Sequence, residues 1–437
     1  MTQMWDVVII GGGLAGYIAA NYLAKSDLSI LILEKGNKVG GRAQTEKIKQ
    51  DYFNLGPHAL YKKGKAAVIL EELDIKLDGG SPKLGGILTR NTKEYTAPFN
   101  PLGLLTTSLL NWKERIEWIF ILSKIQQVDT QALADQTFQE WVEKGVQSKN
   151  VQSLLFVLGR LSTYCHCPEK VSAKIVVTHI KTSLGGVLYL HDGWQTIIDQ
   201  LHNKAVIKGV QIKTHFIVKQ VIPTEHRSLK MILSNNEEIF CKYVISTTGP
   251  LELTNLLGEI ENVKANNIFS QLTPVKGASL DISLSQLPHP KKLFALDMND
   301  SLYYSVHSNV ASLSENRKNS IVHVFKYYHP DDSIDSIKVR NELEQFLETM
   351  QPGWRDVCVT SRFLPNITVN QRLPLVGHEK YFQRSETEIP GLYIAGDWAS
   401  PHYILSEGAA CSGKQAAEEI IQKEVISCRS AMKSINN

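Results

Sequence analysis

The sequence predicts an α/β protein with two domains: a Rossmann-like domain of discontinuous segments and an inserted α+β domain. Three observations carry this prediction. The apolar run Asp6–Ile10 leads into a glycine-rich turn and a helical pattern, as in one βα unit of a parallel sheet. Strand-like runs return after residue 186 and again before the C-terminus, whereas residues 81 to about 160 are mostly helical. A chain of 437 residues is also too long for one core.

The turn after the first strand indicates a dinucleotide site. Gly11 permits the tight turn, Gly13 lets the backbone approach a pyrophosphate, and Gly16 lets the next helix lie close to the strand. The free N–H groups at the start of that helix suit phosphate oxygens. The predicted contact segment consists of Gly11, Gly12, Gly13, Leu14, Ala15 and Gly16.

The second strand, Ser29–Leu33, ends at an acidic residue, Glu34. A carboxylate at this position can accept hydrogen bonds from both hydroxyls of an adenosine ribose. It would also repel a 2′-phosphate, so the sequence disfavours NADP.

Two further turns extend the predicted site. After Lys35, Gly41 allows the backbone to fold back, and the Arg42 guanidinium can meet pyrophosphate oxygens in a bidentate way. A nicotinamide dehydrogenase has no need of this second phosphate contact. The next turn is tight and apolar, and suits a backbone pressed against a flat ring; we expect His58 to be a catalytic candidate beside that ring. The residues of this turn are Gly56, Pro57, His58 and Ala59.

The C-terminal part supplies the second strong motif. A strand-like run, Gly391–Ala395, delivers Gly396 and Asp397 to the cofactor; the glycine allows a close approach, and the carboxylate can bond a hydroxyl or a water. A helix expected from Glu407 to about Glu424 offers free N–H groups that suit the electron-rich edge of a flavin ring. The residues predicted at its start are Glu407, Gly408 and Ala409.

Together these motifs resemble the FAD-dependent superfamily of amine oxidases, protoporphyrinogen oxidases and phytoene desaturases. The resemblance covers the chain through about His58 and from about Pro390 to Ala417, with weaker matches between these segments. It implies FAD as the cofactor and a backbone contact of Val218 with the adenine. It also implies that Lys276 is a catalytic candidate, similar to the lysine that holds a water near the flavin in amine oxidases. Amine oxidases usually have an aromatic cage residue where this chain has Leu405, which argues against an amine substrate.

The two domains are expected to alternate along the chain. The FAD-binding domain comprises residues 1–80, 186–265 and 366–425, and the substrate domain residues 81–185 and 266–365. Residues 426–437 form a C-terminal tail, and we expect about the last ten residues to be disordered.

Composition excludes several function classes. The 47 basic and 44 acidic residues give a net charge of +3, and no basic cluster is interleaved with aromatic residues, so we expect no nucleic-acid partner. Six cysteines in a chain of this length make no disulfide framework, and the pair Cys165 and Cys167 has no second pair for zinc. We therefore expect no metal, reduced thiols and a cytoplasmic protein.

The sequence contains one apolar helical segment that could contact a membrane surface. The apolar run before Gly11 is too short for a signal peptide, and no stretch of about twenty apolar residues could span a bilayer. The apolar segment Ile116–Leu122 lies inside a helical pattern. We expect it to pack in a core or line a substrate tunnel, with peripheral membrane contact as the alternative. The sequence leaves the oligomeric state open.

No second GxGxxG unit occurs, so there is no evident site for NAD(P)H, and the flavin would be reduced by its own substrate. The sequence thus predicts an FAD-dependent oxidoreductase, of desaturase or dehydrogenase type, that removes hydride from a C–H bond of an apolar or amphipathic small molecule. An amine oxidase or a protoporphyrinogen-type oxidase using oxygen is the alternative. A prenyl-protein binding module and a non-redox flavin isomerase also remain open.

Overall fold

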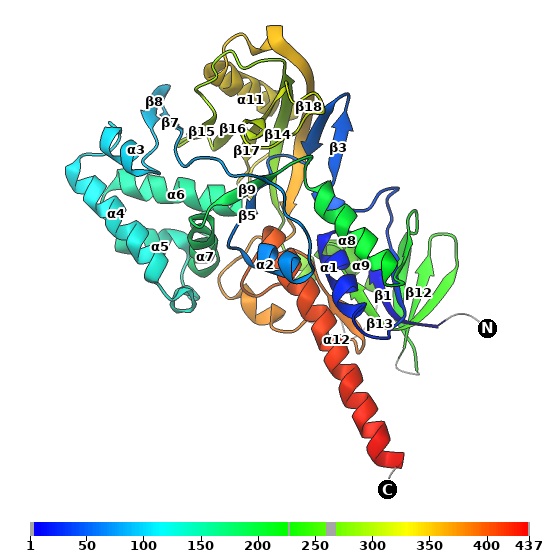
Figure 1. Ribbon diagram of the computed structural model, residues 1–437. Coiled ribbons are helices and arrows are strands. Elements are labelled where there is room, and N and C mark those ends of the chain that lie inside the picture. The colour runs from blue at the N-terminus through cyan, green and yellow to red at the C-terminus, as the bar shows by residue number, and fades with distance from the viewer. Residues whose placement is uncertain (1–3, 226–227, 259–267, 436–437) are drawn as a thin grey trace.

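Two seven-stranded sheets organise the protein, whose computed structural model describes residues 4–225, 228–258 and 268–435 (Figure 1). The first sheet has the strand order β10-β2-β1-β13-β12-β11, with β19 beside β13. Its centre is parallel, since β1 pairs in parallel with both β2 and β13, and β13 with β19. This confirms the predicted Rossmann-like sheet. Its strands are β1 Met4–Ile10, β2 Ile30–Leu33, β10 Gln211–Lys213, β11 Val218–Pro223, β12 Leu229–Leu233, β13 Glu238–Ser246 and β19 Leu392–Ile394.

The first sheet is covered on both faces, which is why its central strands are continuous apolar runs. All four residues of β2 are buried, as are Val7, Val8 and Ile9 of β1. One face packs against α1, α2, α8 and α12, and the other packs against α9 and the loops around Phe382. These helices are α1 Leu14–Leu23, α2 Lys65–Glu72, α8 Gln195–Ile207, α9 Pro250–Leu257 and α12 Leu405–Ile435.

The second sheet is mainly antiparallel and has the order β18-β14-β17-β16-β15-β7-β8. One face packs against α11 (Ser336–Met350), and the other faces a layer of five helices. With those helices it forms the predicted α+β part. Its strands are β7 Ile87–Arg90, β8 Lys93–Thr96, β14 Val275–Leu284, β15 Phe294–Asp297, β16 Leu302–Val306, β17 Ser320–Tyr327 and β18 Cys358–Asn370.

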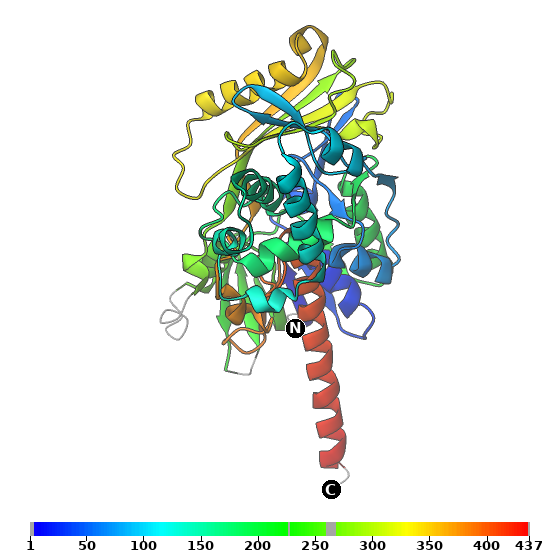
Figure 2. The same cartoon turned by 90° about the vertical axis from the view of Figure 1, so that its left-hand side faces the viewer.

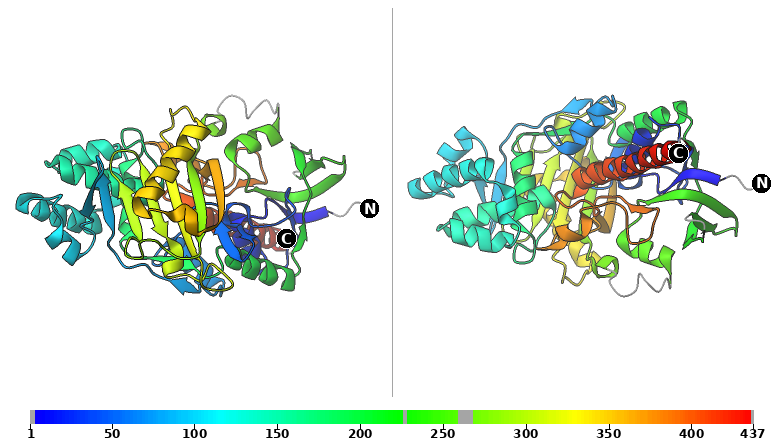
Figure 3. Two further views of the ribbon diagram at one scale, coloured as in Figure 1. Left: turned by 90° about the horizontal axis from the view of Figure 1, so that it is seen from above. Right: turned by 90° about the horizontal axis from the view of Figure 1, so that it is seen from below.

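The helical layer lies at the end of the molecule farthest from the N-terminus (Figure 3). Its helices begin at capping side chains: Asn111 and Glu114 form a capping box on α4, and Thr137 and Glu140 form one on α5. The five helices are α3 Pro101–Thr106, α4 Trp112–Gln127, α5 Phe138–Gly145, α6 Lys149–Thr163 and α7 Ala173–Ser183.

Short elements join the two sheets. A hairpin and a three-stranded sheet lie between them, and six 3₁₀ turns are described. The strands are β3 Thr45–Ile48, β4 Asp51–Asn54, β5 Leu60–Tyr61, β6 Gly79–Gly80 and β9 Val187–Leu190. The 3₁₀ turns are Gly41–Ala43, Thr130–Leu133, Ile268–Gln271, His307–Asn309, Trp354–Val357 and His378–Phe382.

The C-terminal helix departs from the sequence-based expectation. The helix was expected to end at about Glu424 and to be followed by disorder, but α12 continues to Ile435 and projects from the body (Figures 1 and 2). The expectation of disorder is therefore wrong through Ile435, and residues 436–437 lie outside the described part. Ion pairs of Lys423 with Glu386 and of Glu424 with Lys242 hold the middle of the helix.

The domain boundaries stay a prediction, and the boundary at 265/266 falls in 259–267, outside the described residues. Among the residues described, no helix combines the length and the apolar character needed to cross a bilayer.

Candidate functional site

The glycine turn joins β1 to α1 at the carboxyl edge of the first sheet. Gly11 has φ +107°, and a Cβ atom there would lie 2.4 Å from Thr247 Oγ1. A Cβ atom at Gly16 would lie 2.2 Å from the carbonyl oxygen of Gly11, so any side chain would push the helix off the strand. Among the residues that the structure describes, no side chain caps α1 at Gly13, so the helix N-terminus is open to an anion.

Glu34 is held at the end of β2 by backbone donors. Its Oε2 accepts from the N–H of Gly12 at 2.8 Å, and its Oε1 accepts from the N–H of Gly36 at 2.7 Å. These bonds fix the carboxylate at the cavity wall, and each oxygen keeps a lone pair for a further donor. This arrangement suits the two hydroxyls of a ribose.

Arg42 and Asp397 form a bidentate ion pair. Arg42 Nη2 donates to Asp397 Oδ1 at 2.7 Å and Nη1 to Oδ2 at 2.5 Å, and Oδ2 also accepts from the N–H of Gln371. The sequence predicted that each residue faces the cofactor separately. They instead meet each other, because planar guanidinium and carboxylate groups match in a fork geometry. Both still line the cavity, and the Arg42 side chain is 39% exposed.

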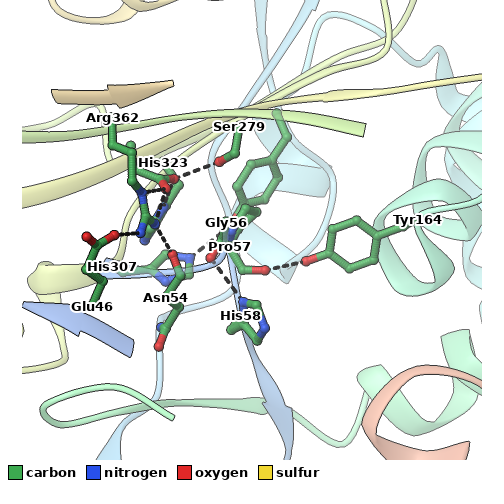
Figure 4. A network of polar contacts seen from close by, with 12 residues as sticks. Glu46, Asn54, Gly56, Pro57, His58, Tyr164, Ser279, His307, His323 and Arg362 are labelled. Carbon is green, nitrogen blue, oxygen red and sulfur yellow. Dashed lines mark hydrogen bonds and ion pairs between the residues drawn. The ribbon is translucent and has the colours of Figure 1, made fainter. Parts of the chain in front are cut away.

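His58 links two turns rather than offering a free base. Its Nδ1 lies 3.0 Å from the carbonyl oxygen of Gly56 (Figure 4), and its Nε2 lies 3.1 Å from the carbonyl oxygen of Arg42. Burial lowers the pKa of His58, so the ring is neutral and donates to only one of these carbonyls at a time. Tyr164 donates to the carbonyl of Pro57 at 2.7 Å and fixes the same turn. The ring lines the cavity, but this geometry gives no support to a catalytic role.

Glu407 points away from the cavity. It is buried, and its Oε2 accepts from the N–H of Ala66 at 3.0 Å, so the carboxyl group caps the N-terminus of α2. Gly408 packs against the carbonyl of Asp397. Of the three residues predicted at the start of α12, Ala409 lines the cavity, and Glu407 and Gly408 do not.

Lys276 lies on the wrong face of its strand to reach the cavity. Along β14, Ala278 and Leu280 pack in the core beneath α11, and Lys276 shares their side by the two-residue alternation. Thr368, opposite Lys276 on β18, lines the cavity, but β-bulges flank this pair, and Lys276 itself is not part of the lining. The structure therefore does not bring Lys276 to the site, and its predicted catalytic role gains no support.

One continuous cavity of about 1510 Å³ runs from the glycine turn to the helical layer. Pockets for single drug-sized ligands are ~300–1,000 Å³, so this one has room for a dinucleotide and a second molecule. Most predicted cofactor residues line it. They are Gly11, Gly13, Leu14, Ala15, Glu34, Lys35, Gly41, Arg42, Pro57, His58, Ala59, Val218, Gly396, Asp397 and Ala409. Gly12, Gly16 and Gly56 support the wall through the backbone contacts of Glu34, Gly11 and the second sheet.

Sequence reasoning missed a pair of side chains at the far part of the cavity. Tyr303 and His307 both line the cavity, and the Tyr303 hydroxyl lies 3.2 Å from His307 Nε2. Burial, with His323 and His58 nearby, holds the pKa of His307 well below its usual range, so its ring is neutral. Burial also raises the pKa of Tyr303, so its hydroxyl is the donor. The two residues come from β16 and the following turn, and carry no motif.

A buried polar network lies behind His307. The His323 ring is 4.5 Å from that of His307, and His323 Nδ1 lies 2.7 Å from Asp281 Oδ1 (Figure 4). Arg362 donates to Asp281 Oδ2 at 2.6 Å, and to the carbonyl of Asn54. His323 and Arg362 hold the pKa of the buried Asp281 below its usual range, although burial alone would raise it. The network thus joins the second sheet to the turn that carries His58.

The comparison with protein families decides what this site is. The model of the family described as "Flavin containing amine oxidoreductase" matches residues 14–421, nearly the whole chain. The chain belongs to this flavin-containing amine oxidoreductase family. It is an enzyme of that family, and its cofactor is FAD. The open glycine turn, the fixed Glu34 carboxylate and the length of the cavity fit this cofactor.

One similar protein in the flavin-containing amine oxidoreductase family matches nearly the whole chain, and another matches less than half of it. The chain is 20% identical to a 15-cis-phytoene desaturase of Synechococcus elongatus over 96% of both chains. It is 26% identical to a probable flavin-containing monoamine oxidase A of Dictyostelium discoideum, but over 45% of each chain. Among solved structures, an oxidoreductase from Methanosarcina mazei superposes with a TM-score of 0.75 at 17% identity, over 95% of this chain and all of that one. The family model establishes the family and the superposition establishes the fold, whereas these identities leave the substrate undetermined.

Proposed function

We propose that the enzyme oxidises a C–H bond of an apolar or amphipathic small molecule, as a desaturase or dehydrogenase. The observation that carries the proposal is the distribution of charge along the cavity. Of the described residues that line it, the acidic ones are Glu34, Glu252 and Asp397, and all three belong to the first sheet and its connections. Toward the helical layer, the described residues of the wall include no carboxylate to pair with an amine cation.

The far wall is built from apolar and aromatic side chains. Trp118 and Leu122 of α4 contribute to it, as do Leu158 and Leu161 of α6. Leu405, the position of the aromatic cage residue in amine oxidases, also lines the cavity and packs against the helical core. Such a wall orients a substrate by shape and excludes water, and both effects favour a reaction at a C–H bond.

FAD supplies, when bound, a two-electron acceptor that takes a hydride. Glu34 and the N-terminus of α1 would hold its ribose and pyrophosphate, and the Arg42–Asp397 pair would lie beside them. When a desaturation forms a C=C bond, one carbon loses a hydride and its neighbour loses a proton. We propose that Tyr303 and His307 take this proton: the Tyr303 hydroxyl would accept it from the substrate while donating its own proton to the neutral His307 ring.

The test is anaerobic reduction of the flavin by candidate substrates. We expect a polyene precursor to bleach the flavin absorbance and a polyamine to leave it unchanged. His307→Gln should slow the bleaching and shift its pH profile while retaining FAD. His378→Gln, which changes a histidine outside the cavity lining, should match the wild type. Bleaching by amines alone would overturn the proposal.

Amine oxidation is the second candidate, because the similarity to the Dictyostelium monoamine oxidase supports it. Aromatic rings are also present in the cavity at Tyr61, Tyr164 and Tyr189. An amine substrate would require these rings to receive its cation. The same anaerobic experiment separates the two candidates.

A further inference from the structure

The helical layer exposes an unusually apolar surface on α3 and α4. Seven large apolar side chains on α3, on α4, at the start of α4 and in the loop before β7 are between 55% and 71% exposed. They form what we call the α3–α4 patch: Leu84, Leu102, Leu105, Trp112, Ile116, Ile119 and Phe120. Single exposed apolar residues are ordinary on a protein surface, but a group of this size on adjoining elements indicates a contact surface.

The helix α4 is apolar on two sides. Its residues Trp118, Ile121 and Ile125 are buried in the core of the helical layer. Trp112, Ile116 and the pair Ile119–Phe120 follow at intervals of three and four residues, so they share the outward side. A surface helix normally has a polar outer side. The outward side of α4 therefore carries apolar side chains where a helix exposed to water would carry polar ones.

The acidic residues of α4 turn inward. Glu117 accepts from the N–H groups of Gln147 and Ser148, at the start of α6, and Glu114 accepts from the Ser148 hydroxyl and from the N–H of its own cap, Asn111. Both carboxylates therefore bind groups within the helical layer and do not lie among the apolar side chains of the patch.

The basic residues near the patch remain outside. Lys83, Lys113 and Lys124 are exposed, and within the described part of the chain Lys83 and Lys113 form no ion pair. Arg115, by contrast, is half-buried: its guanidinium lies 5.0 Å from the ring of Trp112 and donates to the carbonyls of Leu110 and Thr107. The patch thus combines apolar side chains with a positive margin, the combination that binds an anionic lipid surface.

The patch also meets the cavity. Lys83 and Leu84 line the cavity and are exposed, so the cavity reaches the surface at this point. The side chain of Asn100, the residue that caps α3, donates to the carbonyl of Leu84 at 2.6 Å and ties this rim to the patch. Figure 3 shows α3 and α4 (cyan) at the end of the molecule opposite the N-terminus.

We propose that the α3–α4 patch docks the enzyme on a lipid bilayer with anionic headgroups, which places the cavity opening against the lipid. A second copy of the chain is the less suitable occupant, because paired patches would bring like charges together and close the opening. Docking itself is independent of the reaction; entry of the substrate from the bilayer rests on the proposed function.

The test is co-flotation of the FAD-loaded enzyme with vesicles, without substrate, so its result does not depend on turnover. Wild-type enzyme should bind phosphatidylcholine vesicles that contain phosphatidylglycerol, and salt should weaken the binding. Ile116→Glu and Phe120→Glu should each reduce the partition coefficient about tenfold. Lys113→Glu should reduce binding to the anionic vesicles more than to pure phosphatidylcholine vesicles.

Ile337→Glu is the matched control, because Ile337 is 76% exposed on α11, away from the patch. It should bind vesicles as the wild type does, and all variants should retain FAD, since the changes lie on the surface. The proposal is overturned if the wild type floats with neither vesicle, or if patch variants and control bind alike. It is also overturned if light scattering shows a dimer that Phe120→Glu dissociates.

Discussion

Glu407 gives the sharpest quantitative prediction, because a neutral substitute keeps its shape. The side chain is 1% exposed, and within the described residues its Oε1 has no hydrogen-bond partner. Burial raises its pKa from an ordinary value of 4.5 to about 7, although the N–H groups at the start of α2 favour the ionised form. We therefore expect Glu407→Gln to stabilise the protein at alkaline pH.

The magnitude follows from linkage. In the unfolded chain the carboxyl group ionises near pH 4.5, whereas in the folded protein it keeps its proton until about pH 7. The free energy of unfolding therefore falls as the pH rises through this window, by about 3 kcal/mol at 1.36 kcal/mol for each pH unit. Gln removes this component, and its amide oxygen can still accept from the N–H of Ala66. The stability of the variant relative to the wild type should increase by about 3 kcal/mol between pH 4.5 and 8.

The assay is urea unfolding of both proteins with excess FAD, followed by intrinsic fluorescence over that pH range. Glu418→Gln is the control, since Glu418 lies on the same helix with its side chain 49% exposed, and it should leave the pH dependence unchanged. Parallel pH curves for Glu407→Gln and the wild type would refute the reasoning, because they would mean that the buried carboxyl group ionises alike in both states.

Three further predictions concern the cofactor site and the core. Glu34→Ala should weaken FAD binding about tenfold or more while the fold remains, as charge-assisted bonds to a ribose contribute ~1.5–3 kcal/mol; fluorescence titration of the apoprotein measures this, and unchanged affinity would remove the ribose assignment. Asp397→Asn should lower the free energy of unfolding by about 1–3 kcal/mol, because Arg42 loses its charged partner; thermal unfolding tests it, and an unaltered midpoint would contradict it. Burial lowers the pKa of His179 to about 4, so the unfolded chain binds its proton first as the pH falls below 6.5. Between pH 6.5 and 4, the free energy of unfolding should therefore fall by about 3 kcal/mol less for His179→Asn than for the wild type. An equal fall in both proteins would contradict a neutral, buried His179 ring.

Local motifs made the first sheet predictable. The apolar strands, the glycine turn and Glu34 lie within one βα unit, so the spacing of residues there is also their arrangement in space. The pairing of Arg42 with Asp397 joins positions 355 residues apart, and each residue alone indicates a contact with the cofactor. No single-sequence pattern shows that the two charges satisfy each other.

The far part of the cavity was unpredictable for a similar reason. Tyr303 and His307 stand on a strand and turn of the second sheet, and their role depends on its register against β17, which carries His323. The face taken by Lys276 depends on a different register, that of β14 against β18, so a position at the start of a strand was too little to place its side chain. The helix α12 continues to Ile435 because its last turns contain residues that favour helix. The prediction of a disordered tail gave these residues too little weight.

The pairing of β19 with β13 has a consequence for how the protein is made. The strand Leu392–Ile394 completes the sheet that β1 begins, and Asp397 follows directly after it. A ribosome adds ~5–20 residues per second, so roughly 20 to 70 s separate the synthesis of Arg42 from that of its partner, 355 residues later. Until then the nascent chain lacks the part of the groove wall formed by Gly396 and Asp397, and the end of β13 lacks its partner β19. We therefore expect FAD to be captured only after β19 has been made, and a chain cut short before β19 to lack FAD.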